Sequence, residues 1–296
     1  MKKISIVIVT YNSEKDIYSC LNSVITNSDI PLEELEIIIV DNNSKQADCM
    51  FAKIHEKYGN DIILIKNEKN GGYGQGNNVG IRRASAPIIL IMNPDVRLEK
   101  PSFKKVINRF KKDPKLSMYG MKQLLDDSTY SSNSFCASKM MNGYLSTFLT
   151  GFCNKKDIYI PQWMHFSGSC FYIRKRMFEA IGLFDESIFM YGEEHDIQQR
   201  MKNKFGAHFF YDKNITYKHL TLERVTTEET EDKMLKSIIK VNEKFGFSKE
   251  KTIKVKIQNI NVLLAREILR KYMHCSYSQE KINLFRSYKQ HIKSFL

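Results

Sequence analysis

The sequence predicts an α/β fold with a largely parallel sheet, on three observations. Short apolar runs of strand length occur at residues 4–9, 35–40, 62–65 and 88–92. Segments with helical or glycine-rich patterns separate these runs, and polar residues follow each of them. Strands that alternate with helices form mostly parallel sheets with right-handed crossovers, and ligands bind at the carboxyl ends of such strands.

The first strand and helix show this pattern clearly. Residues 4–9 are an apolar, mostly β-branched run that ends in Thr10, Tyr11 and Asn12. Apolar residues then recur at helical spacing over residues 17–24. The segment is therefore predicted to be strand, loop and helix.

Polar residues also follow the next three strands. Asp41 and Asn43 follow the second strand, Asn67 the third, and Asn93 and Asp95 the fourth. Because parallel strands end at one edge of a sheet, these residues are expected to converge there. Asp41 could accept hydrogen bonds from a nucleobase N–H or a ribose hydroxyl, although an aspartate in this position also favours a helix cap or a turn.

The main functional hypothesis, a cation site beside a diphosphate, rests on the residues that follow the fourth strand, 88–92. This strand is uniformly apolar, as in a strand buried on both faces, and Asn93, Pro94 and Asp95 follow it. A carboxylate at this edge can hold a hard divalent cation that shares its charge with a diphosphate. The alternative is a simple turn, which all three residues favour.

The glycine-rich stretch at residues 70–80 does not match a dinucleotide-binding fingerprint. A valine stands where the third glycine of G-x-G-x-x-G should fall, and the stretch follows the third strand rather than the first. Glycines such as Gly72 could let the backbone pass close to a nucleotide or sugar ring. Asn77 and Asn78 are predicted to begin a helix and to face the ligand.

The middle of the chain is expected to form the acceptor side. Residues 126–138 read as a long mobile loop, and residues 139–160 contain aromatics without clear periodicity. Residues 163–174 return to a strand-like pattern. Within them, Gly168 and Ser169 are small enough to let a substrate approach the main chain.

A second acidic centre contains Glu193, Glu194 and Asp196. Apolar residues repeat every four positions behind it, so the acids occupy the first turn of an amphipathic helix. Acids favour helix N-termini for dipole reasons alone, worth about 0.3–1 kcal/mol each. Three acids in four positions also repel each other, which raises carboxylate pKa values toward those of a useful base, and we favour function.

Composition sets outer limits on this interpretation. Hydrophobic residues make up 42% and charged residues 27% of the chain, as in globular proteins. No apolar run reaches the ~18 residues of a membrane helix, and the first residues do not resemble a signal peptide. Six scattered cysteines favour a reducing, cytoplasmic location. The net charge of +13 predicts an acidic partner, which could be phosphate, nucleic acid or an anionic membrane.

The last fifty residues are strongly basic. From Lys249 onward, eleven lysines and arginines face three glutamates, so 11 − 3 = +8 of the net charge lies here. Apolar residues at helical spacing over 257–272 predict a basic amphipathic helix. It could dock on anionic lipid, or it could pack on the catalytic domain or on a second copy in a homodimer.

Taken together, residues 4–222 resemble a family 2 glycosyltransferase of the GT-A fold, and specifically bacterial rhamnosyltransferase-like members. The motifs that carry the resemblance are Val9-Thr-Tyr-Asn12, Val40-Asp-Asn-Asn-Ser44, Asn70-Gly-Gly-Tyr-Gly-Gln-Gly-Asn-Asn78, Met92-Asn-Pro-Asp95, Ser167-Gly-Ser169, Gly182-Leu-Phe-Asp-Glu186, Glu193-Glu-His-Asp196 and His219. It implies a Rossmann-like, mixed sheet at 1–225, with a nucleotide-sugar half (1–100) and an acceptor half (101–225), followed by a basic helical extension at 226–296.

The resemblance also implies roles for individual residues. Asp95 would hold Mg²⁺ or Mn²⁺ with help from His219, Glu194 would be the catalytic base, and Glu193 would support it. The residues expected to contact the donor nucleotide are Thr10, Tyr11, Asn12, Asp41, Asn43, Gly72, Asn77, Asn78 and Asn93. Those expected to contact the acceptor are Gly168, Ser169 and Asp196.

The sequence departs from the family pattern at three places. Asn93 replaces the first acid of the D-x-D motif, so metal binding would rest on one carboxylate. Glu194 stands where the family often has aspartate, and the residues after His219 lack the usual glycine and serine. Read without the family, His219 is an ordinary polar residue at a strand end.

The expected activity is inverting transfer of a sugar, with rhamnose favoured, by single displacement. The donor would be dTDP- or UDP-linked and the acceptor a glycan or lipid-linked glycan in cell-surface polysaccharide synthesis. No nucleic-acid partner is expected, and the location would be cytoplasmic or peripheral at the inner face of the membrane. The alternatives are a sugar-phosphate nucleotidyltransferase and a non-catalytic basic module that binds membrane or nucleic acid.

Overall fold

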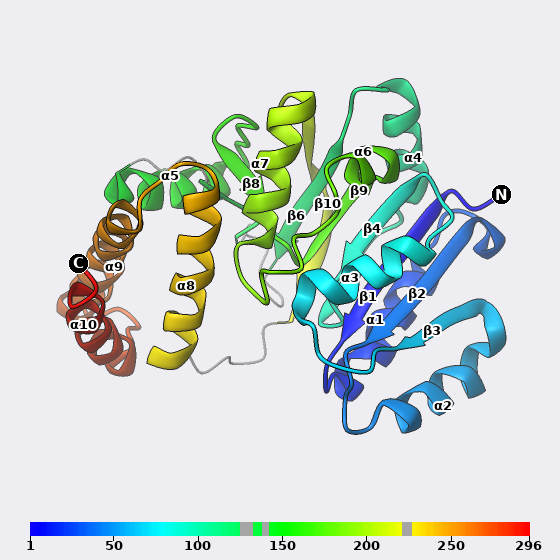
Figure 1. Ribbon diagram of the computed structural model, residues 1–296, viewed down its shortest axis with the longest axis horizontal. Coiled ribbons are helices and arrows are strands. Elements are labelled where there is room, and N and C mark those ends of the chain that lie inside the picture. Colours follow the sequence, from blue (N-terminus) through cyan, green and yellow to red (C-terminus); the bar gives the residue numbers. More distant parts are fainter. Residues whose placement is uncertain (125–132, 138–141, 221–226) are drawn as a thin grey trace.

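The computed structural model describes residues 1–124, 133–137, 142–220 and 227–296. Its centre is an eight-stranded mixed sheet with strand order β3-β2-β1-β4-β9-β6-β10-β5 (Figure 1). The strands are β1 (Ile4–Thr10), β2 (Leu35–Asp41), β3 (Ile62–Lys66), β4 (Ile88–Met92), β5 (Val96–Leu98), β6 (Met118–Leu124), β9 (Cys170–Arg174) and β10 (Phe209–His219). Strands β1 to β4 lie parallel to one another, and β9 runs antiparallel to both β4 and β6. The predicted fold class is confirmed.

Helices cover both faces of the sheet because side chains alternate along its strands. On β1, Ile4, Ile6 and Ile8 pack into one core, while Val7 packs into the other. The helices on the first core are α1 (Glu14–Thr26), α2 (Ala47–Tyr58) and α4 (Phe103–Lys112). Those on the second are α3 (Gly72–Arg83), α6 (Lys175–Ala180) and α7 (Glu193–Phe205). A small antiparallel pair, β7 (Phe135–Ala137) and β8 (Met164–Phe166), lies next to α7.

The C-terminal helices form a separate packed group at the end of the molecule opposite β3 (Figure 1). They are α8 (Glu228–Lys244), α9 (Lys249–Tyr272) and α10 (Gln279–Lys293). Leu235, Ile260, Tyr288 and Ile292 form their small core. The apolar face of α9 around Ile260 therefore packs within its own chain, which was one of the open alternatives. No helix in the described ranges is long and apolar enough to cross a membrane.

One helix was not predicted. Residues 139–160 lack a clear apolar period, yet α5 (Gly143–Lys156) forms there and packs on α9. The period is hidden because aromatic residues of α5, such as Phe148, face solvent instead of a core. Most of the loop predicted at 126–138 lies outside the described residues, as does the predicted boundary between 225 and 226.

Candidate active site

The carboxyl ends of β1, β2 and β4 meet at one cavity of about 370 Å³. Its lining residues are Val9, Tyr11, Ser13, Asp16, Asn42, Asn70, Gly72, Tyr73, Asn93, Pro94, Asp95 and Met190. Backbone hydrogen bonds tie these strand ends together, since Asn42 N–H donates to Thr10 and Asn67 N–H donates to Asp41. The predicted convergence of polar strand ends is therefore observed, and we call this space the donor cavity.

Asp95 stands in the turn that joins β4 to β5. Val96 pairs with His219 across β5 and β10, so the strand register places His219 beside Asp95. The Asp95 Oδ2 and His219 Nε2 atoms lie 3.3 Å apart. The turn interpretation and the functional interpretation of this motif are thus compatible, because the turn itself presents the carboxylate to the cavity.

The Asp95–His219 pair fits a divalent cation that is shared with a ligand. A carboxylate oxygen and an imidazole nitrogen are suitable donors for Mn²⁺. His219 Nε2 is buried and, apart from the Asp95 carboxylate beside it, has no hydrogen-bond partner among the described residues. No group of three or more His, Cys, Asp or Glu side chains suited to a metal occurs in the described residues. Any cation held here would therefore take its other ligands from phosphate and water.

A buried hydrogen-bond network shapes the loops after β1 and β2. Thr10 Oγ1 donates to Asp41 Oδ2 at 2.9 Å, and the Ser44 N–H and hydroxyl both donate to the Asp41 carboxylate. Asn12 N–H donates to Ser44 Oγ at 2.7 Å. Asn12 and Asn43 adopt positive φ, which asparagine tolerates well. The network holds Tyr11 at the cavity, while Thr10 and Asp41 are fully buried, so direct contact of Asp41 with a base stays a prediction.

Gly72 is required by a close backbone approach. Its φ is +88°, and a Cβ at this position would lie 2.1 Å from the carbonyl oxygen of Phe189. Asn42 Nδ2 donates to the Gly72 carbonyl at 2.9 Å, and Gly72 N–H donates to Asn70 Oδ1. Sequence reasoning missed Asn42, Asn70 and Tyr73 as lining residues, although all three belong to motifs that flank predicted site residues.

The structure corrects the roles predicted for Asn77 and Asn78. Asn77 is buried, and its amide donates back to the carbonyl of Tyr73 within α3. Asn78 is also buried, and it exchanges two hydrogen bonds with the backbone of Phe184. Neither residue lines the donor cavity. They face inward because α3 packs its side against the segment before α7, so Asn78 anchors that segment instead of a nucleotide.

Glu194 is the second residue of α7 and lines a second cavity of about 410 Å³, which we call the acceptor-side cavity. Burial raises the pKa of Glu194, although backbone N–H groups including that of Gly168 partly offset this effect. Glu193 is buried and does not line the cavity. Burial and the neighbouring Glu194 carboxylate raise the pKa of Glu193. The pKa values of both glutamates are therefore raised, which is the direction expected from the sequence for acids crowded into one helical turn.

Two backbone contacts connect the two cavities. Tyr73, which lines the donor cavity, donates its hydroxyl to the Gly168 carbonyl at 2.6 Å. Gly168 lies directly against Glu194, because a Cβ at Gly168 would lie 2.2 Å from Glu194 Oε1. Asn93 N–H donates to the Ser169 carbonyl at 2.9 Å, which fixes the loop after β4 to the same segment. The Asp95 and Glu194 regions are thus neighbours across residues 168–169.

Two of the residues predicted to bind an acceptor have structural roles instead. Ser169 is buried, and its hydroxyl bonds to Gln123 and Tyr217 beneath the site. Asp196 is fully buried and forms ion pairs with Arg200 and Lys244. Neither residue lines the acceptor-side cavity. The third, Gly168, touches Glu194 and stays a candidate contact.

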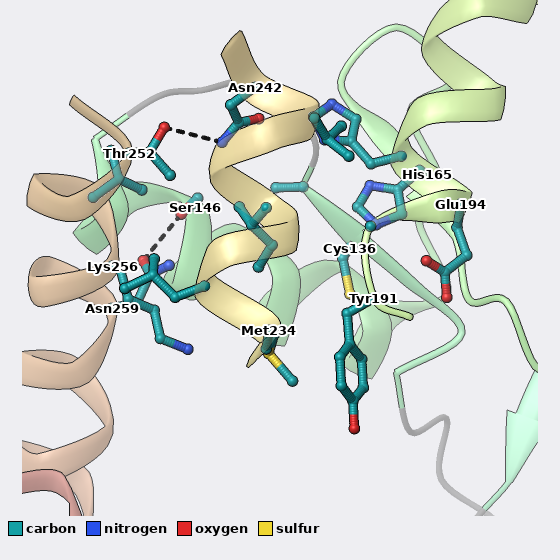
Figure 2. A pocket seen from close by; sticks show the side chains of 17 residues that line it. Cys136, Ser146, His165, Tyr191, Glu194, Met234, Asn242, Thr252, Lys256 and Asn259 are labelled. Carbon is teal, nitrogen blue, oxygen red and sulfur yellow. Dashed lines mark hydrogen bonds between the residues drawn. The ribbon is translucent and has the colours of Figure 1, made fainter. Parts of the chain in front are cut away.

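The acceptor-side cavity has two walls of different character (Figure 2). Glu194, Tyr191 and His165 lie on the wall formed by β8, α7 and the segment before α7, and Met234 and Lys256 lie on α8 and α9. His165 stacks on His195 with ring centroids 5.5 Å apart. Burial lowers the pKa of His165 well below its ordinary value and that of His195 to about 4. Both imidazoles are therefore neutral at physiological pH.

Comparison with known proteins assigns the class. The model of glycosyl transferase family 2 matches residues 5–182, and the chain belongs to this family. It is an α/β protein of the GT-A type.

Two relatives in this family share about a third of their residues or fewer with the chain over the matched regions. The chain is 28% identical over 208 residues to the low-salt glycan biosynthesis hexosyltransferase Agl10 of Haloferax volcanii, covering 68% of this chain and 62% of that protein. It is 34% identical over 107 residues to the poly(ribitol-phosphate) beta-N-acetylglucosaminyltransferase TarS of Staphylococcus aureus, covering 35% and 18%. The chain thus spans less than two thirds of either relative.

Solved structures agree on the fold. Residues 1–349 of S. aureus TarS match with a TM-score of 0.56 at 17% identity, over 99% of this chain and 92% of that one. The mannosyltransferase PcManGT of Pyrobaculum calidifontis, solved with GDP-Man and Mn²⁺, matches with a TM-score of 0.62 at 13% identity, over 98% and 84%.

Proposed function

We propose that the chain is an inverting glycosyltransferase acting across the two cavities. A dTDP- or UDP-linked sugar binds in the donor cavity beside Asp95, and an acceptor hydroxyl enters the acceptor-side cavity beside Glu194. The observation that carries the proposal is the contact of Gly168 with both Tyr73 and Glu194. It places a carboxylate with a raised pKa at the border between two ligand-sized spaces.

Glu194 is proposed as the general base. As the acceptor oxygen attacks the anomeric carbon, its proton passes to Glu194, and the bond from that carbon to the diphosphate breaks on the opposite face. This single displacement inverts the anomeric configuration. A raised pKa suits the task, because a base is most effective when its pKa lies near the working pH.

Asp95 and His219 would hold a Mg²⁺ or Mn²⁺ ion together with the donor diphosphate. When bound, the cation supplies positive charge to the departing diphosphate. Calorimetry with UDP should show binding that is strengthened by Mn²⁺ in the wild type. Asp95→Asn should lose most of this strengthening, whereas Asp61→Asn, at an exposed position just before β3, should keep it. If UDP affinity depends on Mn²⁺ equally in Asp95→Asn and in the wild type, Asp95 does not hold the cation.

A panel of nucleotide sugars and a Glu194→Gln variant test the activity. The panel includes dTDP-rhamnose, the donor that the resemblance favours, together with UDP-linked hexoses, and product release is measured with glycan acceptors. Glu194→Gln keeps the shape of the side chain, so donor affinity should stay near wild type while turnover falls by about 10²–10⁴-fold. Glu56→Gln, on the exposed side of α2, is the matched control. Turnover of Glu194→Gln near that of the control would contradict the assignment, as would an NMR spectrum showing retained configuration.

The proposal extends to the acceptor and the location. Agl10 and TarS are named for glycan biosynthesis and for poly(ribitol-phosphate) glycosylation, which supports a glycan or lipid-linked glycan in cell-surface polymer assembly. All six cysteines are free, consistent with a cytoplasmic location. The non-catalytic alternative predicts that Glu194→Gln changes nothing measurable, so the same variant separates the two hypotheses.

A further inference from the structure

Helix α5 exposes a stripe of aromatic side chains. Tyr144, Phe148 and Phe152 recur every four residues and therefore share one face of the helix. All three are exposed, with Phe148 at 65%, and the Phe148 and Phe152 rings stack on each other with centroids 6.2 Å apart. Large apolar side chains grouped on a surface mark an interaction site more often than single ones do.

The stripe continues onto the end of α9. Asn261 Nδ2 donates to the Tyr144 hydroxyl at 3.0 Å, which fixes α5 against α9 at this point. An apolar groove of about 460 Å³ lies here, lined by Tyr144, Asn261, Val262, Ala265, Arg266, Leu269, Arg270 and Met273. Leu269 is 59% exposed, and Tyr272 and Met273 beside it are also exposed. We call the residues Tyr144, Phe148, Phe152, Leu269, Tyr272 and Met273 the apolar patch.

Positive charge surrounds the apolar patch. Helices α5 and α9 carry nine lysines and arginines against two glutamates. Both glutamates are neutralised locally, since Glu250 pairs with Lys254, while Glu267 is buried and pairs with Arg270. Arg266 and Lys271 are exposed next to Leu269, and Lys155 and Lys156 follow Phe152. The patch therefore has a basic rim with little compensating negative charge.

We propose that the apolar patch and its basic rim dock on an anionic phospholipid bilayer. Aromatic side chains favour the interface between headgroups and acyl chains, and each lysine or arginine near the surface is attracted to anionic lipid. Of the apolar face of α9 that the sequence suggested, Ile257 and Ile260 pack on α8 and α10, while its end at Tyr272 belongs to this surface.

The same helices also line the acceptor-side cavity. Ser146 of α5 and Lys256 and Asn259 of α9 face that cavity, and Ser146 lies within hydrogen-bond distance of Asn259 (Figure 2). Docking through the outer sides of α5 and α9 would therefore bring the cavity next to the membrane. This consequence rests on the proposed function, because a lipid-linked acceptor would reach Glu194 from the bilayer. The docking itself does not depend on catalysis.

Vesicle co-sedimentation of the full chain tests the proposal. The protein should bind vesicles of phosphatidylcholine mixed with phosphatidylglycerol, bind much less to phosphatidylcholine alone, and dissociate as salt is raised. Phe148→Ser combined with Phe152→Ser should weaken binding to the mixed vesicles by about tenfold or more. Arg266→Glu combined with Lys271→Glu should weaken it similarly and reduce the salt dependence.

Matched controls lie far from the patch. Leu269→Ser should weaken binding while Leu32→Ser, at a leucine that is 48% exposed near the start of β2, should not. Lys111→Glu with Lys112→Glu, at the end of α4, controls for net charge alone. Equal binding by patch and control variants would overturn the proposal. So would a wild-type dimer in sedimentation velocity that the patch variants dissociate, since the patch would then bind a second copy.

Discussion

Replacing Gly168 by alanine should slow catalysis with little effect on stability. The new Cβ would lie 2.2 Å from Oε1 and 2.6 Å from Cγ of Glu194, and ordinary contact begins at 3.4 Å. The carboxylate must therefore shift by 3.4 − 2.2 = 1.2 Å, which the flexible end of a glutamate can do at low cost. A shift of about 1 Å in a catalytic group can cost about 100-fold in rate, or about 2.7 kcal/mol of activation free energy.

Three measurements separate this effect from its alternatives. The value of kcat should fall by about 100-fold, whereas calorimetric affinity for UDP and the urea midpoint should stay close to wild type. Gly151→Ala is the control, because a Cβ there meets nothing within 4 Å and the residue lies on helix α5, outside the sheet. The reasoning is refuted if Gly168→Ala turns over at the wild-type rate, or if its whole loss appears in donor affinity.

Three further predictions concern stability. Gly72→Ala should lower the free energy of unfolding by more than about 2 kcal/mol in urea titrations, because φ is +88° and the Cβ meets the Phe189 carbonyl; Gly59→Ala, also at positive φ but with open space around it, should cost less. Asp196→Ala should cost about 2–3 kcal/mol by leaving Arg200 and Lys244 without their buried partner, and an unchanged midpoint would contradict this role. The pKa of Glu193 is raised from 4.5 to about 8, so the folded state binds the extra proton between these values and wild-type stability should fall as pH rises through that window. In Glu193→Gln this fall in the thermal midpoint should be smaller, and an identical pH profile would argue against the shifted pKa.

The sequence by itself determined the strands at the centre of the sheet and the edge at which a ligand binds. Apolar runs of four to six residues bounded by polar residues leave few alternatives to buried strands. Parallel strands then bring their carboxyl ends together, so Tyr11, Asn93 and Asp95 could be placed at one cavity without knowing any contact. The acids at the start of α7 were recognisable because so many like charges in one turn are costly without a function.

Only the tertiary structure decided which polar side chains face the cavities. Asn78, Ser169 and Asp196 belong to family-like motifs just as Asn93 and Glu194 do, yet they bond inward to elements distant in the sequence. Local periodicity gives the face of a helix or strand on which a residue lies, but the packing of other elements decides whether that face meets ligand or protein. For the same reason α5 escaped prediction, since the aromatic side chains Tyr144, Phe148 and Phe152 are exposed and the packing of α9 determines the position of the helix.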